Sequence, residues 1–340
     1  MDKNMTAIFN EKKFLSNYNK AISQIDKIEE FANSLDINKI DKIFFVGSGG
    51  AFTKFVSMRP LIIELIPISN VITSPEELIS LYIDEITEKS LIVFGTKTGE
   101  TVELIDALNI IDKTKSNIKM IGFIGDENTS IDNQKIIFKR ISSVDTDVHI
   151  ILFGWLLISL NKKINQENKN QIKDELISIG QNISDILYNQ KEILKNQVSE
   201  RKIGTREMWV GSGRLWGEIC CYTNYVLEEI QWIFSQPIHS SEFFHGPFEL
   251  VDKNFVPNLV LNTDNNREQD LRVKKFIDSF EIKYILIDMK DFYLPYKYSE
   301  TKKIVEPYIL NHVFDILLNI YTESTGKSTK TRRYYRKIDY

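Results

Sequence analysis

Short apolar runs alternate with helical patterns through the first half of the chain. Between the runs, apolar residues recur at helical spacing, and each run ends in glycine, serine or threonine. Because the runs are almost continuously apolar, both faces of each strand should be covered. This pattern predicts an α/β domain with a parallel sheet. The four runs are Lys42–Val46, Val71–Thr73, Ser90–Phe94 and Lys119–Ile124.

The second half of the chain repeats this alternation of apolar runs and helical patterns. Glu207-Met208-Trp209-Val210 runs into Gly211-Ser212-Gly213-Arg214, which resembles Phe44-Phe45-Val46 followed by Gly47-Ser48-Gly49-Gly50. Further apolar runs at residues 258–262 and 284–288 predict more strands, with a helix at about 267–280 between them. We therefore predict an internal duplication, with a second parallel sheet.

Helical segments frame the two predicted sheets. Amphipathic patterns cover residues 9–35, an apolar segment covers 150–160, a long polar-apolar run covers 162–202, and an apolar helix covers 304–321. We predict N-terminal helices at residues 1–36, a first domain at 37–165, a linking helix at 166–202, a second domain at 203–322 and a tail at 323–340.

Composition narrows the class of protein. The 340 residues are 42% hydrophobic and 26% charged, as in soluble globular proteins. The net charge of −4 and the interspersed Lys and Glu argue against a nucleic-acid surface. No apolar run is long enough to span a membrane, and the first residues lack the pattern of a signal peptide, so we expect a cytoplasmic protein without a membrane partner. The neighbours Cys220 and Cys221 are expected to be buried thiols, without a metal site.

The segment from Leu227 to Glu249 holds the first candidates for chemistry. In an α-helix, a stripe through Leu215, Ile219, Tyr222 and Val226 continues to Glu229 but misses Glu228. A carboxylate on an inward face needs partners and is a candidate catalytic base. A structural ion pair, or a frayed last turn, is the alternative.

His245 is the candidate acid. It precedes the rigid turn Gly246-Pro247, which would fix the orientation of the imidazole. His239 is its rival, whereas His149 and His312 lie in apolar helical sequence and are expected to be core residues. Glu229 and His245 together would form a general base and acid able to move protons on a sugar.

The loop Thr96-Lys97-Thr98-Gly99-Glu100-Thr101 is a candidate anion site. It follows a strand and opens a helix, so hydroxyls and backbone N–H groups would converge where a phosphate binds. The alternative is a threonine-capped helix. The two glycine turns do not predict a dinucleotide-binding site, because neither has the full Gly-x-Gly-x-x-Gly pattern. Ser48 and Ser212, within these turns, could still face a ligand.

These motifs resemble, in order and spacing, those of the sugar isomerase (SIS) domain family. The matching residues are Gly47 to Gly50, Thr96 to Thr101, and Glu229 followed by His245-Gly246-Pro247. The chain looks like a tandem pair of such domains over residues 37–322, as in the isomerase half of glucosamine-6-phosphate synthase. The segment Glu229–Glu249 and the tail from Thr331 resemble fructoselysine 6-phosphate deglycases.

The resemblance implies two flavodoxin-like, doubly wound subdomains that act on a sugar phosphate without a cofactor or a metal. It implies a homodimer or higher homo-oligomer with shared active sites, and a tail over the site. The expected reaction is the cleavage of a fructosamine 6-phosphate to glucose 6-phosphate and an amino acid. The alternatives are a hexose-6-phosphate isomerase or aminotransferase-like enzyme and a noncatalytic phosphosugar-binding regulator. The implied catalytic residues are Glu229 and His245; the implied binding residues are Ser48, Gly49, Thr96, Lys97, Thr98, Thr101 and Ser212.

Overall fold

The computed structural model describes residues 8–200, 203–204, 206–335 and 337–338. The chain forms two compact units. The N-terminal unit comprises Lys12–Gln181 and Tyr296–Tyr308, and the C-terminal unit comprises Met1–Glu11, Asn182–Pro295 and Ile309–Tyr340. Each unit is built around one parallel sheet, as the apolar runs predict.

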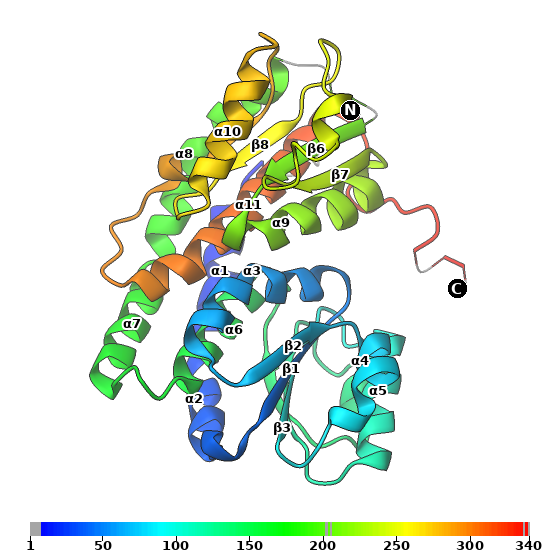
Figure 1. Ribbon diagram of the computed structural model, residues 1–340, viewed down its shortest axis with the longest axis vertical. Helices are drawn as coiled ribbons and strands as arrows, with labels where there is room; N and C mark the ends of the chain where they lie inside the picture. The colour runs from blue at the N-terminus through cyan, green and yellow to red at the C-terminus, as the bar shows by residue number, and fades with distance from the viewer. Residues whose placement is uncertain (1–7, 201–202, 205, 336, 339–340) are drawn as a thin grey trace. The chain divides into compact units, whose positions relative to one another are not determined.

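The sheet of the N-terminal unit has five parallel strands in the order β2-β1-β3-β4-β5. Figure 1 labels the first three strands of this order. This is the doubly wound, flavodoxin-like strand order, so the predicted fold class is confirmed for this unit. The strand β5 was not predicted, because it is short and begins with the charged residues Lys139 and Arg140. The strands are β1 Lys42–Val46, β2 Ser69–Thr73, β3 Ser90–Thr96, β4 Lys119–Ile124 and β5 Lys139–Ser142.

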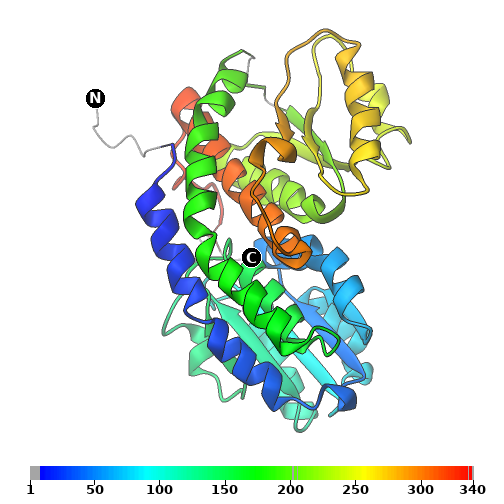
Figure 2. The ribbon, with the colours of Figure 1, turned by 90° about the vertical axis from the view of Figure 1, so that its left-hand side faces the viewer.

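Helices cover both faces of this sheet (Figure 2). Phe44 and its neighbours on alternate strand positions pack against α4 and α5, whereas Phe45 points the other way and meets Phe55 of α3. Phe55 in turn stacks on Phe153 of α6, with 4.1 Å between ring centroids. Every residue of α6 is buried, as predicted for residues 150–160. The helices are α1 Glu11–Ile22, α2 Ile25–Ser34, α3 Gly49–Leu65, α4 Pro75–Tyr82, α5 Val102–Thr114, α6 His149–Leu160 and α7 Gln166–Ser178.

The sheet of the C-terminal unit has the order β7-β6-β8-β9, again all parallel. In both sheets, the first strand of the unit in the sequence lies between the second and the third, and the fourth follows the third. The second sheet therefore repeats the order β2-β1-β3-β4 of the first. Gly49 and Gly213, which follow β1 and β6, both adopt a positive φ, of 55° and 60°. The predicted duplication therefore extends to the strand-to-helix turns. The strands are β6 Arg206–Gly211, β7 Phe234–His239, β8 Asn258–Leu261 and β9 Leu286–Asp288.

The second sheet is also covered on both faces. Val273 and Ile277 of α10 pack on one face with Val210 and Leu259. On the other face, the Trp209 ring meets Tyr222 and Phe314 edge-on, and Tyr222 and Phe314 stack at 4.2 Å. The helices are α8 Gly180–Ser199, α9 Trp216–Cys221, the π-helix η5 Tyr222–Gln231, α10 Arg267–Asp278 and α11 Ser299–Thr325.

Two segments differ from the prediction. The run at 162–202 forms two helices, α7 and α8, which are separated at Ile179. The strand β7 was missed inside the segment Leu227–Glu249, which was predicted to be a helix end and a turn. β7 contains Pro237, which cannot donate a ladder hydrogen bond and therefore suits its place at the edge of the sheet. Short 3₁₀ turns lie at Ile37–Lys39, Ile83–Glu85, Ser130–Asn133, Gly213–Leu215, Pro247–Leu250 and Met289–Phe292.

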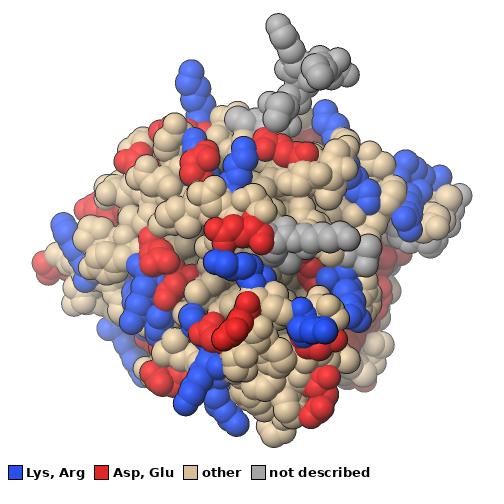
Figure 3. All heavy atoms as spheres, turned by 90° about the horizontal axis from the view of Figure 1, so that it is seen from above, with Lys and Arg blue, Asp and Glu red and all other residues tan. Residues whose placement is uncertain are grey.

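Acidic and basic side chains are interspersed over the face seen in Figure 3, without a broad field of one sign. This distribution agrees with the low net charge. Within the described part of the chain, no helix is both long and apolar enough to cross a bilayer.

Candidate active site

Glu229 lies near the end of η5, a π-helix that continues directly from α9. The predicted stripe assumed α-helical spacing, which holds as far as Tyr222. In the wider π-turns the buried face passes instead through Thr223, Leu227 and Gln231. Glu229 is consequently only half-buried, with its side chain 34% exposed. π-Helical segments occur frequently at functional sites, where they reorient side chains.

The partner of Glu229 is Arg332 of the C-terminal tail. The Arg332 Nε donates to Glu229 Oε1 at 2.5 Å, and Arg332 Nη1 donates to the carbonyl oxygen of Thr329 at 2.8 Å. These residues all belong to the C-terminal unit. The tail therefore covers the helix end that carries the candidate base, and Glu229 has the ion-pair partner that a half-buried carboxylate needs.

Trp232 ends the π-helix in the left-handed conformation, with φ 56° and ψ 34°. This backbone conformation is costly for a bulky residue and often marks a functional position. Its ring carries two cations of the tail: Lys327 Nζ lies 3.6 Å from the ring centroid and the Arg333 guanidinium carbon 4.0 Å. Trp232 thus anchors the tail through cation–π contacts.

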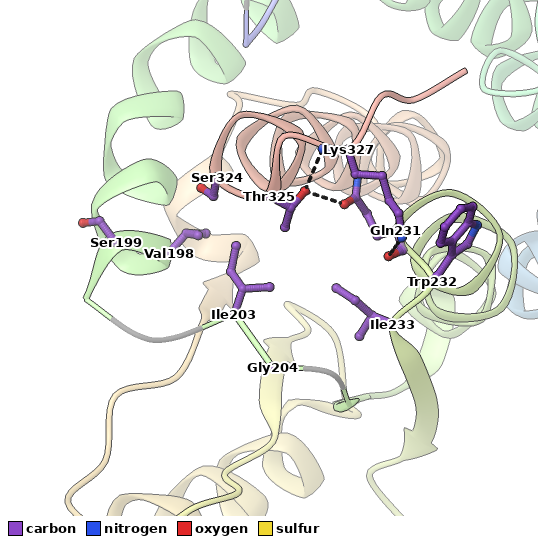
Figure 4. Close-up of a pocket in the computed structure, with 10 residues that line it drawn as sticks. All are labelled: Val198, Ser199, Ile203, Gly204, Gln231, Trp232, Ile233, Ser324, Thr325 and Lys327. Atoms are coloured by element: carbon purple, nitrogen blue, oxygen red, sulfur yellow. Dashed lines mark hydrogen bonds between the residues drawn. The ribbon is translucent and has the colours of Figure 1, made fainter. Parts of the chain in front are cut away.

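Two cavities border Trp232. One, of about 610 Å³, lies toward the C-terminal ends of α8 and α11, where Thr325 Oγ1 donates to Gln231 Oε1 (Figure 4). The other, of about 500 Å³, contains Glu229 and is walled by the tail. This second cavity is the candidate active-site pocket of the C-terminal unit, because it alone of the two includes the candidate base. Its wall includes Glu229, Trp232, Phe234 and the tail residues from Arg332 to Tyr335.

His245 lies on the same unit but is exposed, in the turn before Pro247. It is not among the described residues that line the cavity around Glu229. Its rival His239 is half-buried at the end of β7, where Nδ1 lies 2.8 Å from the Ser241 hydroxyl and the ring meets Trp216 edge-on. Burial lowers the pKa of His239, although Glu242 opposes the shift, so the neutral imidazole prevails at neutral pH.

The predicted anion loop lies at the carboxyl end of β3, in the N-terminal unit. Thr96 is buried, and its hydroxyl accepts from the Gly99 N–H at 3.2 Å and lies 3.2 Å from the Thr101 hydroxyl. Thr98 Oγ1 accepts from the Glu100 N–H at 3.3 Å. Gly99 takes a positive φ of 64°, which lets the loop turn tightly. These contacts shape the loop from within and leave the exposed Lys97 at its tip.

Lys97 pairs with Asp145 at 2.9 Å. Burial opposes the shift, but the Lys97 ammonium lowers the pKa of Asp145, so this carboxylate stays ionised. An anion on the loop would share the Lys97 charge with Asp145. This arrangement favours a phosphate that also uses the backbone N–H groups at the start of α5.

Ser48 and Gly49 lie close to this loop by topology. They follow β1, which pairs in parallel with β3, so their turn and the threonine loop share one edge of the sheet. The order of strands reverses at this point, and ligands of open α/β sheets bind at such switch points. The Ser48 hydroxyl is exposed at the N-terminus of α3 and makes no capping hydrogen bond.

At the equivalent edge of the C-terminal unit, the residues that follow the strands are hydrogen-bonded to one buried carboxylate. The buried Asp270 carboxylate accepts from the hydroxyls of Ser212 and Ser240, at 2.7 and 2.6 Å, and from the Asn262 N–H at 2.8 Å. Burial raises the pKa of Asp270, and the three hydrogen bonds oppose that shift. The Ser212 hydroxyl, predicted to bind substrate, is thus engaged within the fold.

The remaining candidates are structural. His149 and His312 are buried, as predicted, and burial lowers the pKa of His149 to about 3. Cys220 and Cys221, which were expected to be buried, are both only partly buried, and burial raises the pKa of the Cys220 thiol to about 12. Within the described ranges, no group of three or more His, Cys, Asp or Glu side chains could hold a metal ion.

Comparison with known proteins supports the resemblance. No model of a protein family matches the chain. Fructosamine deglycase FrlB of Bacillus subtilis (strain 168) is 24% identical over 328 residues, which cover 92% of this chain and 97% of that protein.

Solved structures agree along nearly the whole chain. A Bacillus subtilis protein assigned as a phosphosugar isomerase aligns with a TM-score of 0.80 at 20% identity, covering 96% of this chain and 99% of that one. The chain has the sugar isomerase fold. The C-terminal domain of glucosamine-fructose-6-phosphate aminotransferase from Francisella tularensis aligns with a TM-score of 0.68 at 15% identity, covering 94% of this chain and 98% of that one. The resemblance predicted from the motifs is confirmed.

The contact between Arg332 and Glu229 was not predicted from the sequence. The tail was expected over the site, but no tail residue was assigned to Glu229. The available signal was the cluster of basic residues after the last apolar helix, because isolated buried carboxylates require a cation.

Proposed function

We propose that the chain is a deglycase that cleaves a fructosamine 6-phosphate, such as fructoselysine 6-phosphate, into glucose 6-phosphate and a free amino acid. The observation that carries the proposal is the similarity to a fructosamine deglycase over 92% of the chain. The half-buried Glu229 in a cavity of about 500 Å³ supports it, because this chemistry begins with the abstraction of a proton.

The proposed reaction consists of proton transfers and one hydrolysis. Glu229 removes a proton from C1 of the open-chain amino-ketose while the C2 carbonyl oxygen gains one, which gives an enaminol. Protonation at C2 then converts the enaminol to an imine between C1 and the amine nitrogen. Water adds to C1, the C–N bond breaks, and the amine leaves with a proton. The enzyme would be a hydrolase acting on a C–N bond, and no oxidant or reductant enters the balance.

The other residues take supporting roles in the proposal. Thr96, Thr98 and Thr101, with Lys97 and the turn at Ser48 and Gly49, form the phosphate site. The exposed Ser48 hydroxyl and the Lys97 ammonium support this role. His245 assists ring opening or protonates oxygen. Because His245 is absent from the described wall of the Glu229 cavity, we propose that it serves the site of a second subunit in a homodimer.

The direct test is the release of glucose 6-phosphate from fructoselysine 6-phosphate in a coupled assay. Glu229→Gln keeps the shape of the side chain but removes the base, and should lower kcat by about 100-fold or more. The matched control is Glu192→Gln, which removes an exposed carboxylate of the same unit that is not among the described residues of the cavity wall. Its activity should stay close to that of the wild type.

Three results would contradict the proposal in different ways. Turnover by Glu229→Gln at the wild-type rate would remove Glu229 as the base. Isomerised sugar without release of amine would indicate an aldose-ketose isomerase. Binding of sugar phosphates without turnover of any fructosamine phosphate would indicate a noncatalytic sensor.

A further inference from the structure

Three cations of the C-terminal tail gather around the end of η5. We name Lys327, Arg332 and Arg333, together with Trp232, the Trp232 cluster. Lys327 and Arg333 both lie against the Trp232 ring, and Arg332 pairs with Glu229. The cluster thus joins the candidate base to the tail.

The three cations differ in what they already bind. Lys327 Nζ donates to the carbonyl oxygen of Gln231 at 2.6 Å. Arg332 donates to Glu229 and to the carbonyl oxygen of Thr329. Arg333 is exposed and rests its guanidinium on the Trp232 ring, and no carboxylate among the described residues pairs with it. The N–H groups of a guanidinium that rests on an aromatic face point outward in the guanidinium plane, where they can donate to a planar anion.

The positive charge of the Trp232 cluster also favours the binding of an anion. Lys327, Arg332 and Arg333 carry three positive charges, whereas the described wall of this cavity holds two carboxylates, Glu228 and Glu229. Burial, followed by the Arg333 charge, lowers the pKa of Lys327, so the two cations on Trp232 repel each other. A bound anion would relieve that repulsion. Trp232 itself has a left-handed backbone conformation, which is costly for a bulky residue and often marks a functional position.

The proposed reaction indicates which anion fits. A base that removes the C1 proton must face C1, and C1 carries the amine. Glu229 and Arg333 wall the same cavity of about 500 Å³, so the group attached to the amine would extend within reach of the tail. The 6-phosphate is at the opposite end of the hexose, five carbons from C1.

We infer that Arg333, stacked on Trp232, binds the carboxylate of the amino-acid half of the substrate and so selects amino-acid fructosamines over simple amines. This inference rests on the proposed function. It assigns a specificity determinant to the tail, in addition to its contact with the base.

The test compares two substrates that differ in this carboxylate alone. One is fructoselysine 6-phosphate, and the other is the fructosamine 6-phosphate made from cadaverine, which is decarboxylated lysine. The wild type should prefer the first in kcat/KM by about 10-fold or more, since a charge-assisted bidentate contact is lost with the second. Arg333→Gln should erase the preference by raising KM for the carboxylated substrate, and should leave the cadaverine substrate within about 2-fold.

Lys330→Gln is the matched control, because it removes one positive charge from the same exposed tail. It should leave the preference intact. An equal loss by Arg333→Gln with both substrates, or a wild type without preference, would overturn the inference while the deglycase activity stands. If the wild type releases glucose 6-phosphate from neither substrate, the proposed function fails and the inference fails with it.

Discussion

At the scale of single residues, two glycines in the loops that follow β1 and β3 allow the cost of backbone strain to be compared with the cost of a steric clash. Gly49 and Gly99 both have a positive φ, but a Cβ at Gly49 would meet nothing within 4 Å, whereas one at Gly99 would lie 2.1 Å from Thr129 Oγ1. Gly49→Ala should therefore cost only the conformational penalty, about 1–2 kcal/mol of unfolding free energy. Gly99→Ala should cost about 1–3 kcal/mol more, because Thr129 must move. Urea denaturation of both variants checks the difference, and equal losses would contradict it.

The residue scale also shows what a sequence pattern cannot contain. Glu229 was singled out from an α-helical stripe, and its role as a candidate base stays a prediction. The stripe itself was wrong beyond Tyr222, because η5 has π-turns that move the buried face to Leu227 and Gln231. The partner of Glu229 lies 103 residues further along the chain. No local pattern encodes a contact at that separation.

At the scale of elements, Asp270 links the ends of three strands to one helix. Its carboxylate, on α10, accepts from residues that follow β6, β7 and β8. Asp270→Ala would leave two hydroxyls and one N–H without their acceptor in the interior, which should lower the unfolding free energy by about 3–5 kcal/mol.

Asp278→Ala is the matched control for this helix. Asp278 is exposed, pairs with Lys274 and accepts from the Tyr284 hydroxyl at 2.7 Å, so its loss should cost about 1–2 kcal/mol. Thermal or urea unfolding of the two variants tests the prediction. Similar losses would mean that the strand ends do not depend on the buried carboxylate.

Strands were predictable from the sequence where they have an apolar run of their own. β1, β3 and β4 are almost wholly buried, and their continuous apolar runs predicted them. β5 and β7 lie at sheet edges, where Arg140 and Pro237 are tolerated, and neither has an apolar run. The edge strands β2 and β9 were predicted, because each has a short apolar run, whereas β5 and β7 depend on the neighbouring strand with which they pair.

At the scale of the whole molecule, the duplication was predictable because both copies need the same strand-to-helix turn. Gly49 and Gly213 each supply a positive φ after the first strand of their unit. The environment of the serine in each copy was not predictable from this turn. Ser48 is exposed, whereas the Ser212 hydroxyl is donated to Asp270. The same Gly-Ser-Gly sequence thus carries an exposed serine in one unit and a hydrogen-bonded, buried serine in the other.

The proposed sharing of sites between subunits leads to a prediction for mixed dimers. Glu229→Gln and His245→Ala should each be inactive alone. When the two variants are co-expressed, a mixed dimer has one site with Glu229 from one chain and His245 from the other. Random pairing makes about half of the dimers mixed, each with one intact site of two, so activity should return to about a quarter of the wild-type value.

The control pairs Glu229→Gln with a chain that carries both substitutions, because that combination contains no intact Glu229 in any dimer. It should stay inactive. Failure of the first mixture to recover, in dimers shown by native mass spectrometry to contain both chains, would mean that Glu229 and His245 act within one chain. The exposed turn of His245 would then have to approach Glu229 within its own unit, where the described cavity wall does not include it.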